Sequence, residues 1–421
     1  MTQVEQISRA DAERLDGRDE LAAFRTRFVV DDDTIYLDGN SLGRLPRETP
    51  EVVDAVVRAG WGQGLIGSWH EWIDWSAALG DRLASAVLGA SAGEVVLSDS
   101  TSVNLYKLAA AALGDADPSR RTIVVDAEDF PTNRYIMQGL ARAHGMTIRA
   151  IGSDLDEGIS LADLEAAVND EVALVVLSLV SYRCGALLDM ARVNDIARAA
   201  GSRVVWDLSH AVGAVPVELG SAGTELAVGC TYKYLNAGPG APAFLYVRDD
   251  VQASLRQPIW GWFGQRDQFG MGADYDPVGT VGRFLVSTPP VLSMAPLGPA
   301  LMLIEQAGID ELRRKGTGLT EFLVALVRQR LEPHGFRLAS PADAQRRGTH
   351  VALEHSEAWR ICQALTAAGV ICDFRQPRRI RLAPVPLYTR FIDVWDAVDR
   401  LCHVMTTQRY ERFSASRSRV T

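Results

Sequence analysis

Short apolar runs rich in β-branched residues alternate with amphipathic stretches between about residues 94 and 247. The apolar runs cover residues 122–125, 172–177, 203–206, 226–230 and 243–247. The stretches between them, with a helical spacing of apolar positions, include residues 104–113, 133–143 and 191–200. This alternation is typical of α/β proteins. It predicts a mostly parallel, mixed sheet with helices on both faces.

The pattern changes in the last third of the chain. Residues 261–290 form a stretch rich in glycine, proline and aromatic residues, and a long helical pattern begins at residue 297. Shorter alternating runs follow at 348–353 and 370–382. We therefore predict a large domain over residues 49–295 and a smaller C-terminal α/β domain over 296–408. Residues 1–48 are expected to pack with the small domain, and 409–421 to form a flexible basic tail.

Composition narrows the range of partners. The chain has 421 residues, enough for about two domains, and a formal net charge of −10. That charge argues against a nucleic-acid partner or an anionic membrane, both of which need a basic face. The first residues are polar and acidic, and no apolar run approaches the ~20 residues that cross a bilayer. We expect a cytoplasmic protein.

Five scattered cysteines are odd in number and lack the spacing of a metal site. Buried, reduced thiols are the simplest interpretation, and no metal is expected.

One lysine stands out. The chain has only three lysines against forty arginines, and we interpret Lys107 and Lys315 as structural. Lys233 follows the apolar run 226–230, lies between two tyrosines and precedes a glycine-rich turn. Arginine cannot replace lysine where a primary amine must lose its proton and form a covalent bond. Covalent chemistry is therefore favoured over an ordinary surface charge.

Two polar residues follow the run 203–206, where ligands bind in open α/β sheets. Asp207 comes directly after this run and fits the acid that a pyridoxal cofactor needs beside its ring nitrogen. A helix-capping aspartate is the alternative. His210, three residues later, fits stacking on a ring or hydrogen bonding to it, but an isolated histidine is equally consistent with a structural role.

A phosphate and a carboxylate each have a candidate site. Thr101 and Ser102 precede a helical stretch, and helix N-termini bind phosphate through free backbone N–H groups, although serine and threonine also cap ordinary helices. Arg381 lies on a predicted strand of the small domain, where its guanidinium fits a bidentate clamp for a substrate carboxylate. A basic surface edge is the alternative there.

Several segments together resemble the kynureninase family, a group of fold-type-I hydrolases that depend on pyridoxal phosphate. The similar segments extend from about residue 36 to 395: they are 36–43, 61–66, 130–132, 206–211, 232–238, 261–264 and 380–388. No single segment is decisive, but their order and spacing are specific.

The resemblance implies roles for individual residues. Lys233 would bind the cofactor covalently and remove the substrate α-proton, Asp207 would contact the ring nitrogen, and Tyr232 would hold the phosphate or relay a proton. The other implied positions fall into three groups: around the cofactor, Thr101, Ser102, Phe130, Pro131, Thr132, Asn133, Ser178 and His210; from a neighbouring subunit, Trp262 and Thr288; around the substrate, Arg381, Asn40, Ser41 and His210. The resemblance therefore also implies a homodimer in which both subunits contribute residues to each active site.

The implied reaction is hydrolysis of L-kynurenine or 3-hydroxykynurenine to the corresponding anthranilate and L-alanine. The alternatives are the same cleavage of another ring-substituted kynurenine in secondary-metabolite biosynthesis, a desulfurase or aminotransferase reaction, and a cofactor binder without turnover. Three positions depart from the family pattern. Asn133 stands where the family has aspartate, Gln265 where it commonly has histidine, and the pair Ser287–Thr288 matches neither family variant.

Overall fold

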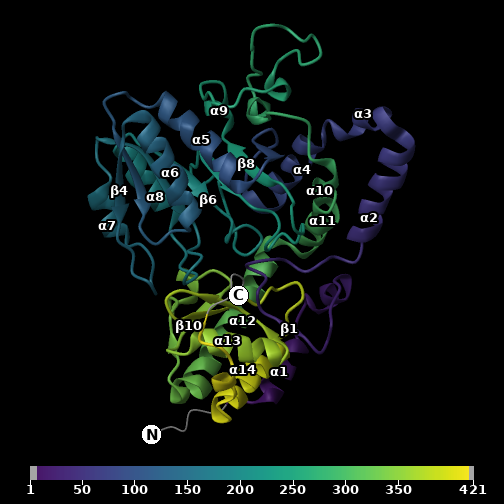
Figure 1. Ribbon diagram of the computed structural model, residues 1–421, viewed down its shortest axis with the longest axis vertical. Helices are drawn as coiled ribbons and strands as arrows, with labels where there is room; N and C mark the ends of the chain where they lie inside the picture. Colours follow the sequence, from purple (N-terminus) through teal and green to yellow (C-terminus); the bar gives the residue numbers. More distant parts are fainter. Residues whose placement is uncertain (1–6, 417–421) are drawn as a thin grey trace.

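The computed structural model describes residues 7–416 and shows a large body above a smaller one (Figure 1). The large body is built on a seven-stranded sheet with the strand order β2-β8-β7-β6-β5-β3-β4. Strand β8 is antiparallel to both of its neighbours, and the other pairs are parallel. The strands are β2 (Val95–Ser98), β3 (Thr122–Asp126), β4 (Thr147–Ile151), β5 (Val172–Ser178), β6 (Arg203–Asp207), β7 (Leu226–Gly229) and β8 (Ala243–Val247).

Helices cover both faces of this sheet because successive strand side chains point to opposite sides. One core contains Val205 and Val228 with residues of α5 and α6, whereas the other contains Val204 and Trp206 with residues of α4, α8 and α11. The helices of this body are α4 (Trp75–Leu83), α5 (Thr101–Asp115), α6 (Pro131–His144), α7 (Leu161–Ala167), α8 (Met190–Ala199), α9 (Asp249–Gln252), α10 (Val291–Met294) and α11 (Leu297–Ala307). The predicted mixed, mostly parallel sheet is confirmed.

The small body has its own core on a four-stranded antiparallel sheet with the order β12-β13-β10-β9. Its elements are α12 (Ile309–Leu326), β9 (Arg337–Leu338), β10 (Val351–Glu354), α13 (Ala358–Ala367), β11 (Val370–Ile371), β12 (Asp373–Arg375), β13 (Arg379–Leu382) and α14 (Phe391–Thr406). Helix α11, which follows the expected boundary at residue 296, packs on the core of the large body. The core of the large body therefore includes a helix that follows the expected boundary.

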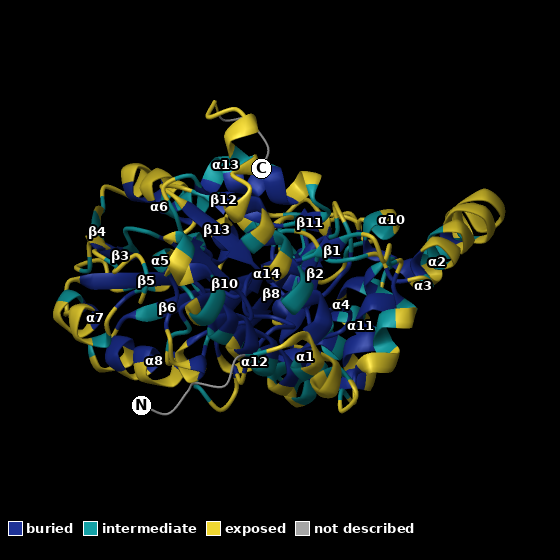
Figure 2. Ribbon diagram, turned by 90° about the horizontal axis from the view of Figure 1, so that it is seen from below, coloured by how far each residue is buried: buried dark blue, intermediate teal, exposed yellow. Residues whose placement is uncertain are grey.

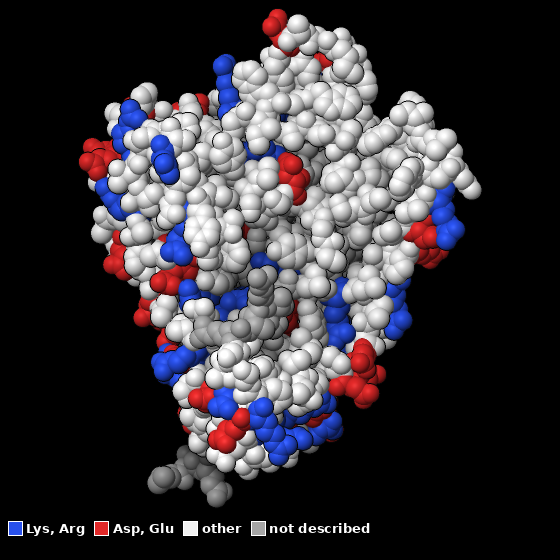
Figure 3. Space-filling view, viewed as in Figure 1, with Lys and Arg blue, Asp and Glu red and all other residues white. Residues whose placement is uncertain are grey.

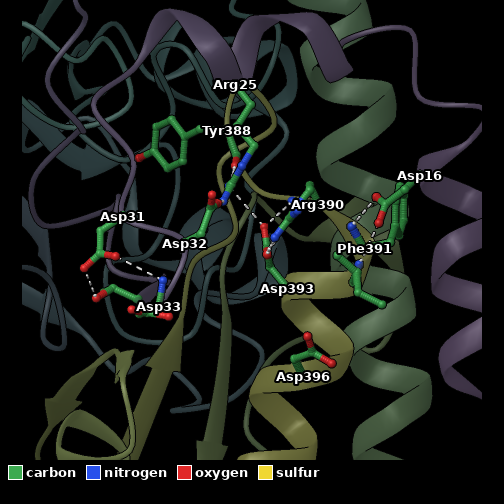
Figure 4. Close-up of polar contacts among 12 residues, drawn as sticks. Asp16, Arg25, Asp31, Asp32, Asp33, Tyr388, Arg390, Phe391, Asp393 and Asp396 are labelled. Carbon is green, nitrogen blue, oxygen red and sulfur yellow. Dashed lines mark hydrogen bonds and ion pairs between the residues drawn. The ribbon is translucent and has the colours of Figure 1, made fainter.

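The N-terminal segment lies against the small body. Helix α1 (Arg9–Asp16) packs on α14, and β1 (Ile35–Tyr36) pairs in parallel with β11. Asp16 accepts hydrogen bonds from the backbone N–H groups of Phe391 and Ile392, at 2.7 and 2.9 Å, and so caps α14 (Figure 4). Arg25 donates to Asp393 in the first turn of the same helix.

Residues 49–72 project from the large body as an arm (Figures 1 and 2). The arm comprises α2 (Thr49–Ala55), two irregular helical segments (Val56–Gly64 and Leu65–Ser68) and α3 (Trp69–Trp72). Most of its side chains are at least partly exposed, including those of Trp61, Leu65 and Ile66. Such a large apolar exposure is typical of a surface that another molecule covers.

Residues 409–416, the first part of the expected tail, lie against α13. A short 3-10 helix, Arg409–Arg412, ends in a segment whose backbone carbonyls accept hydrogen bonds from side chains of α13. Arg360 donates to the carbonyl of Phe413, and Gln363 to that of Ser414. These bonds hold the segment despite its polar composition. The remainder of the expected tail, 417–421, lies outside the described residues.

Among residues 7–416, no single helix is long and apolar enough to cross a membrane; one pair, Val291–Ala307 with Ile309–His334, meets the criterion by length and composition but is bent by 81°.

Candidate active site

A cavity of about 170 Å³ lies at the carboxyl end of β6, where the N-termini of α5 and α6 converge. Nine of the residues singled out by the sequence line it: Thr101, Ser102, Phe130, Thr132, Asn133, Asp207, His210, Tyr232 and Lys233. They come from four separate parts of the chain. The parallel sheet brings them together because the carboxyl ends of β3, β6 and β7 meet at one edge.

One end of the cavity is a helix N-terminus. Strand β2 ends at Ser98, and Ser100 caps α5 by accepting a hydrogen bond from the backbone N–H of Val103 at 3.4 Å. Thr101 and Ser102 occupy the first turn of this 15-residue helix, with their hydroxyl groups at the cavity. Free N–H groups, hydroxyls and the positive end of the helix dipole form a site for a phosphate group.

Lys233 and His210 line the cavity and lie next to each other. The Nζ atom of Lys233 lies 3.3 Å from Nε2 and 3.5 Å from Nδ1 of His210. Burial lowers the pKa of Lys233, and burial together with the positive charge of Lys233 lowers the pKa of His210 well below its ordinary value. A lysine with a lowered pKa provides the free amine that covalent chemistry requires.

Asp207 forms the far wall. Its Oδ1 atom accepts a hydrogen bond from the backbone N–H of Ser209 at 2.9 Å, and its Oδ2 atom accepts one from Nδ2 of Asn133 at 2.9 Å. Only 7% of the residue is exposed. The carboxylate is therefore held in one orientation at the cavity.

The sequence interpretation missed Asp129, which lies behind this wall. Ser178, at the end of β5, donates a hydrogen bond to Asp129 at 2.6 Å instead of lining the cavity itself. Burial, with a further contribution from Asp207, raises the pKa of Asp129 to about 7. Asp129 comes three residues after β3, so examining polar residues at every strand end would have identified it.

Arg381 lies outside the cavity and already has partners. Its Nε atom donates to Oδ1 of Asp373 at 2.8 Å, and Nη2 donates to Oδ2 of Asp373 and to Ser41. The carbonyl of Tyr182 accepts a further bond from Nη1. Four of the five guanidinium N–H groups are thus used. For Arg381 to bind a carboxylate through two N–H groups, the hydrogen bond from Nη2 to the Ser41 hydroxyl must break.

Two buried side chains near Arg381 have polar atoms without hydrogen-bond partners. Both side-chain amide atoms of Asn40 and both ring nitrogens of His350 are buried without a partner among the described residues. The ring centroids of His350 and His210 are 5.9 Å apart. Burial lowers the pKa of His350 to about 3, so the ring is neutral near pH 7. No sequence pattern marked His350, since it simply precedes an apolar strand.

Trp262 and Thr288 do not reach this cavity. Trp262 belongs to a short 3-10 helix, Trp262–Gly264, and is 38% exposed. Thr288 lines a separate apolar cavity, of about 680 Å³, between residues 288–293 and the arm.

Pro131 lies between two residues that line the active-site cavity, Phe130 and Thr132. It is the first residue of α6 and fixes the start of that helix. Over residues 7–416, no cluster of three or more His, Cys, Asp or Glu side chains is arranged to hold a metal.

Comparisons with known proteins agree with this geometry. A family model of the kynureninase C-terminal domain matches residues 312–401. The chain is 41% identical over 405 residues to the kynureninase of Pseudomonas fluorescens, covering 94% of this chain and 95% of that protein. It is 42% identical over 414 residues to the kynureninase of Burkholderia pseudomallei, covering 96% and 97%.

Solved structures share the fold at low identity. The cysteine desulfurase of Thermococcus onnurineus has a TM-score of 0.78 at 17% identity, covering 91% of this chain and 98% of that one. A variant of C-DES, with glycine covalently linked to its PLP cofactor, has a TM-score of 0.79 at 21% identity, covering 90% and 98%. Such likeness supports the fold, whereas the nearly full-length identity to the two bacterial enzymes supports the family. The chain belongs to the kynureninase family.

Proposed function

We propose that this protein uses pyridoxal phosphate to hydrolyse L-kynurenine, or a ring-substituted relative such as 3-hydroxykynurenine, to an anthranilate and L-alanine. The observation that carries the proposal is the placement of Lys233, Asp207 and the N-terminus of α5 around one cavity. These groups fit the three functional parts of the cofactor, which are its aldehyde carbon, its ring nitrogen and its phosphate. Nearly full-length identity to curated kynureninases supports the substrate class.

Each side chain then has a defined task. When bound, pyridoxal phosphate supplies the carbonyl that takes up amines and an electron sink for the carbanion. Thr101 and Ser102, with the N–H groups of α5, bind the phosphate, and Asp207 keeps the ring nitrogen protonated. The Lys233 amine, with its lowered pKa, accepts the substrate α-proton. Tyr232 lines the same cavity, where its hydroxyl either binds phosphate or relays a proton.

Arg381 recognises the substrate carboxylate in this proposal. Its buried position beside Asp373 keeps the guanidinium in a fixed orientation, and release of Ser41 would free Nη2 for the incoming carboxylate. Asn40 supplies a buried amide whose oxygen and nitrogen both lack a hydrogen-bond partner among the described residues. Holding the lysine, the ring and the ketone in register lowers the entropic part of the barrier.

Cysteine desulfuration is the rival reaction that the fold suggests. That chemistry needs a reactive thiol in an exposed, mobile segment. Four of the five cysteines are buried, and the fifth, Cys402, lies on α14. Cys230 borders the cavity, but burial raises the pKa of its thiol. The cysteines therefore favour kynurenine hydrolysis over desulfuration. Their reduced state also supports a cytoplasmic location.

A homodimer is the second part of the proposal. The arm exposes Ile66 to 81%, and the loop that follows Trp262 exposes Phe269 to 66% and Met271 to 71%. Few charged side chains lie on the surface between the arm and this loop (Figure 3). A second copy that covers this surface would bring Trp262 and Thr288 near a cavity that they do not reach within one chain. Sedimentation velocity on Ile66→Glu tests this: we expect monomers, and an unchanged dimer would refute the assignment.

The activity is tested with the purified, cofactor-loaded protein and each of the two kynurenines. We expect equimolar anthranilate (or hydroxyanthranilate) and alanine from at least one of them. Lys233→Ala should abolish product. Arg381→Ala should raise KM sharply, whereas Arg378→Ala, which removes an exposed guanidinium from the same strand region, should not. Cofactor binding without product from either substrate would refute the proposed reaction.

A further inference from the structure

Three polar side chains form a buried row that begins at the wall of the active-site cavity and extends behind it. Asp207 ends β6, Asn133 lies in the first turn of α6, and Asp129 precedes that helix. Nδ2 of Asn133 donates to Oδ2 of Asp207 at 2.9 Å and to Oδ2 of Asp129 at 3.2 Å. Each of the three residues is at most 7% exposed. One amide group therefore bridges two buried carboxyl groups.

The outer member of the row is itself held firmly. Oδ1 of Asp129 accepts hydrogen bonds from the Ser178 hydroxyl at 2.6 Å and from the backbone N–H of Phe130 at 2.7 Å. With the Asn133 amide, three donors surround a carboxyl group that does not line the cavity. Asp129 consequently supports the cavity indirectly, through the Asn133 amide and the backbone of Phe130.

Electrostatics explains why an amide suits the middle position. Burial is the main reason that the pKa of Asp129 is raised to about 7, and the negative charges of Asp207 and Asp126 raise it further. The amide nitrogen of Asn133 carries two hydrogens and satisfies both neighbouring carboxyl groups at once. A carboxylate at residue 133 would instead place three acids in one poorly hydrated space, where their negative charges repel one another.

We propose that Asp129 and Asn133 act as one positioning unit, in which the Asn133 amide holds Asp207 in the orientation that it needs beside the cofactor ring. The inference rests on the proposed function, because the orientation of Asp207 matters to a ring nitrogen only if the cofactor binds here. It assigns Asp129 a positioning role and not a catalytic one, since Asp129 does not touch the cavity.

The experiment exchanges the two side chains. Three variants are compared with the wild type: Asn133→Asp, Asp129→Asn, and the double exchange that carries both changes. Each is loaded with pyridoxal phosphate. The visible absorbance of the bound cofactor is titrated with pH, and the dissociation constant of the cofactor is measured by fluorescence. Thermal unfolding checks that every variant is folded.

We expect Asn133→Asp to raise the midpoint of the absorbance titration by about one pH unit, because an added negative charge favours the protonated cofactor. It should also weaken cofactor binding about tenfold, as loss of a hydrogen bond to a charged group does. Asp129→Asn should lower the midpoint, because it removes a negative charge. The double exchange restores the number of acids in the row but leaves Asp207 facing a carboxyl group at residue 133, so cofactor binding should stay about as weak as in Asn133→Asp.

Equal midpoints in all four proteins would overturn the inference, as would a double exchange that binds the cofactor as tightly as the wild type. These outcomes differ from a failure of the proposed function. If the wild type takes up no cofactor, both proposals are refuted. If the cofactor binds and the midpoints shift as expected but neither kynurenine is cleaved, only the proposed reaction is refuted.

Discussion

Replacement of Lys315 by methionine should strongly destabilise the contact between the N-terminal segment and the small body. Nζ of Lys315, on α12, lies 2.7 Å from Oδ2 of Asp19, and the two side chains are only 5% and 4% exposed. Asp16 and Asp393 also lie near enough to raise the pKa of Lys315, against the lowering caused by burial. Lys315→Met therefore removes a positive charge that acts on the carboxylates of Asp16, Asp19 and Asp393.

The magnitude follows from the burial of the pair. Removal of one partner from a buried ion pair costs about 3–5 kcal/mol. Asp19 keeps a hydrogen bond from the backbone N–H of Leu21 at 3.0 Å, so we expect the lower end, about 3 kcal/mol. Urea unfolding followed by tryptophan fluorescence measures this loss. The double variant Asp19→Asn/Lys315→Met should recover much of it, because the isolated buried charge is then gone.

A neighbouring residue on the same helix provides the control. Arg314 pairs with Glu311 and Glu20, but its side chain is 56% exposed. Solvent screens such pairs, so Arg314→Met should change the free energy of unfolding by less than about 1 kcal/mol. A loss of stability in Lys315→Met no larger than that in Arg314→Met would show that the Lys315–Asp19 pair does not stabilise this contact.

Three further variants test other parts of the structure. Gly43→Ala would place a methyl group 2.3 Å from the Lys233 carbonyl oxygen; we expect loss of bound cofactor on gel filtration, whereas Gly152→Ala, which has open space around it, should retain the cofactor. The lowered pKa of His350, about 3, means that its contribution to stability is complete above about pH 6.5 and is lost as the pH falls toward 3. His350→Gln should therefore flatten the decline of the melting temperature between pH 6.5 and 4, and an unchanged slope would contradict the assignment. Lys107→Met breaks a buried ion pair and should lower the urea midpoint, a result that a solvent-exposed lysine would not give.

The local pattern of the chain was enough to predict the large sheet. Strands such as β5 and β6 are continuous apolar runs, and each lies between amphipathic helices, so period and length identify them with little ambiguity. The small body was harder to delimit. Helix α11 is apolar on most sides, and nothing in its sequence indicates that it packs on the large core rather than on the small one.

The candidate site likewise contains residues that the sequence predicted and residues that only the structure revealed. Lys233 and Asp207 were predictable because a rare lysine and a strand-end carboxylate carry local signals. Thr101 and Ser102 were predictable from a helix N-terminus, and the resemblance added Phe130. Asp129 and Asp373 were missed because their importance comes from partners distant in sequence. Asp373 holds Arg381 from a neighbouring strand, and Asp129 meets Asp207, 78 residues away in sequence, through the amide of Asn133.

The sequence by itself determined the order of the elements, the fold class, the family and the side chains that can perform the chemistry. All of these depend on residue types and spacings along the chain. Only the tertiary structure decided which donors are already used, which carboxyl groups are buried together, and which side chains point away from the cavity. Burial and hydrogen-bond partners arise from segments that meet after folding, so they set the pKa of Asp129 and the orientation of Arg381 without leaving a local trace in the sequence.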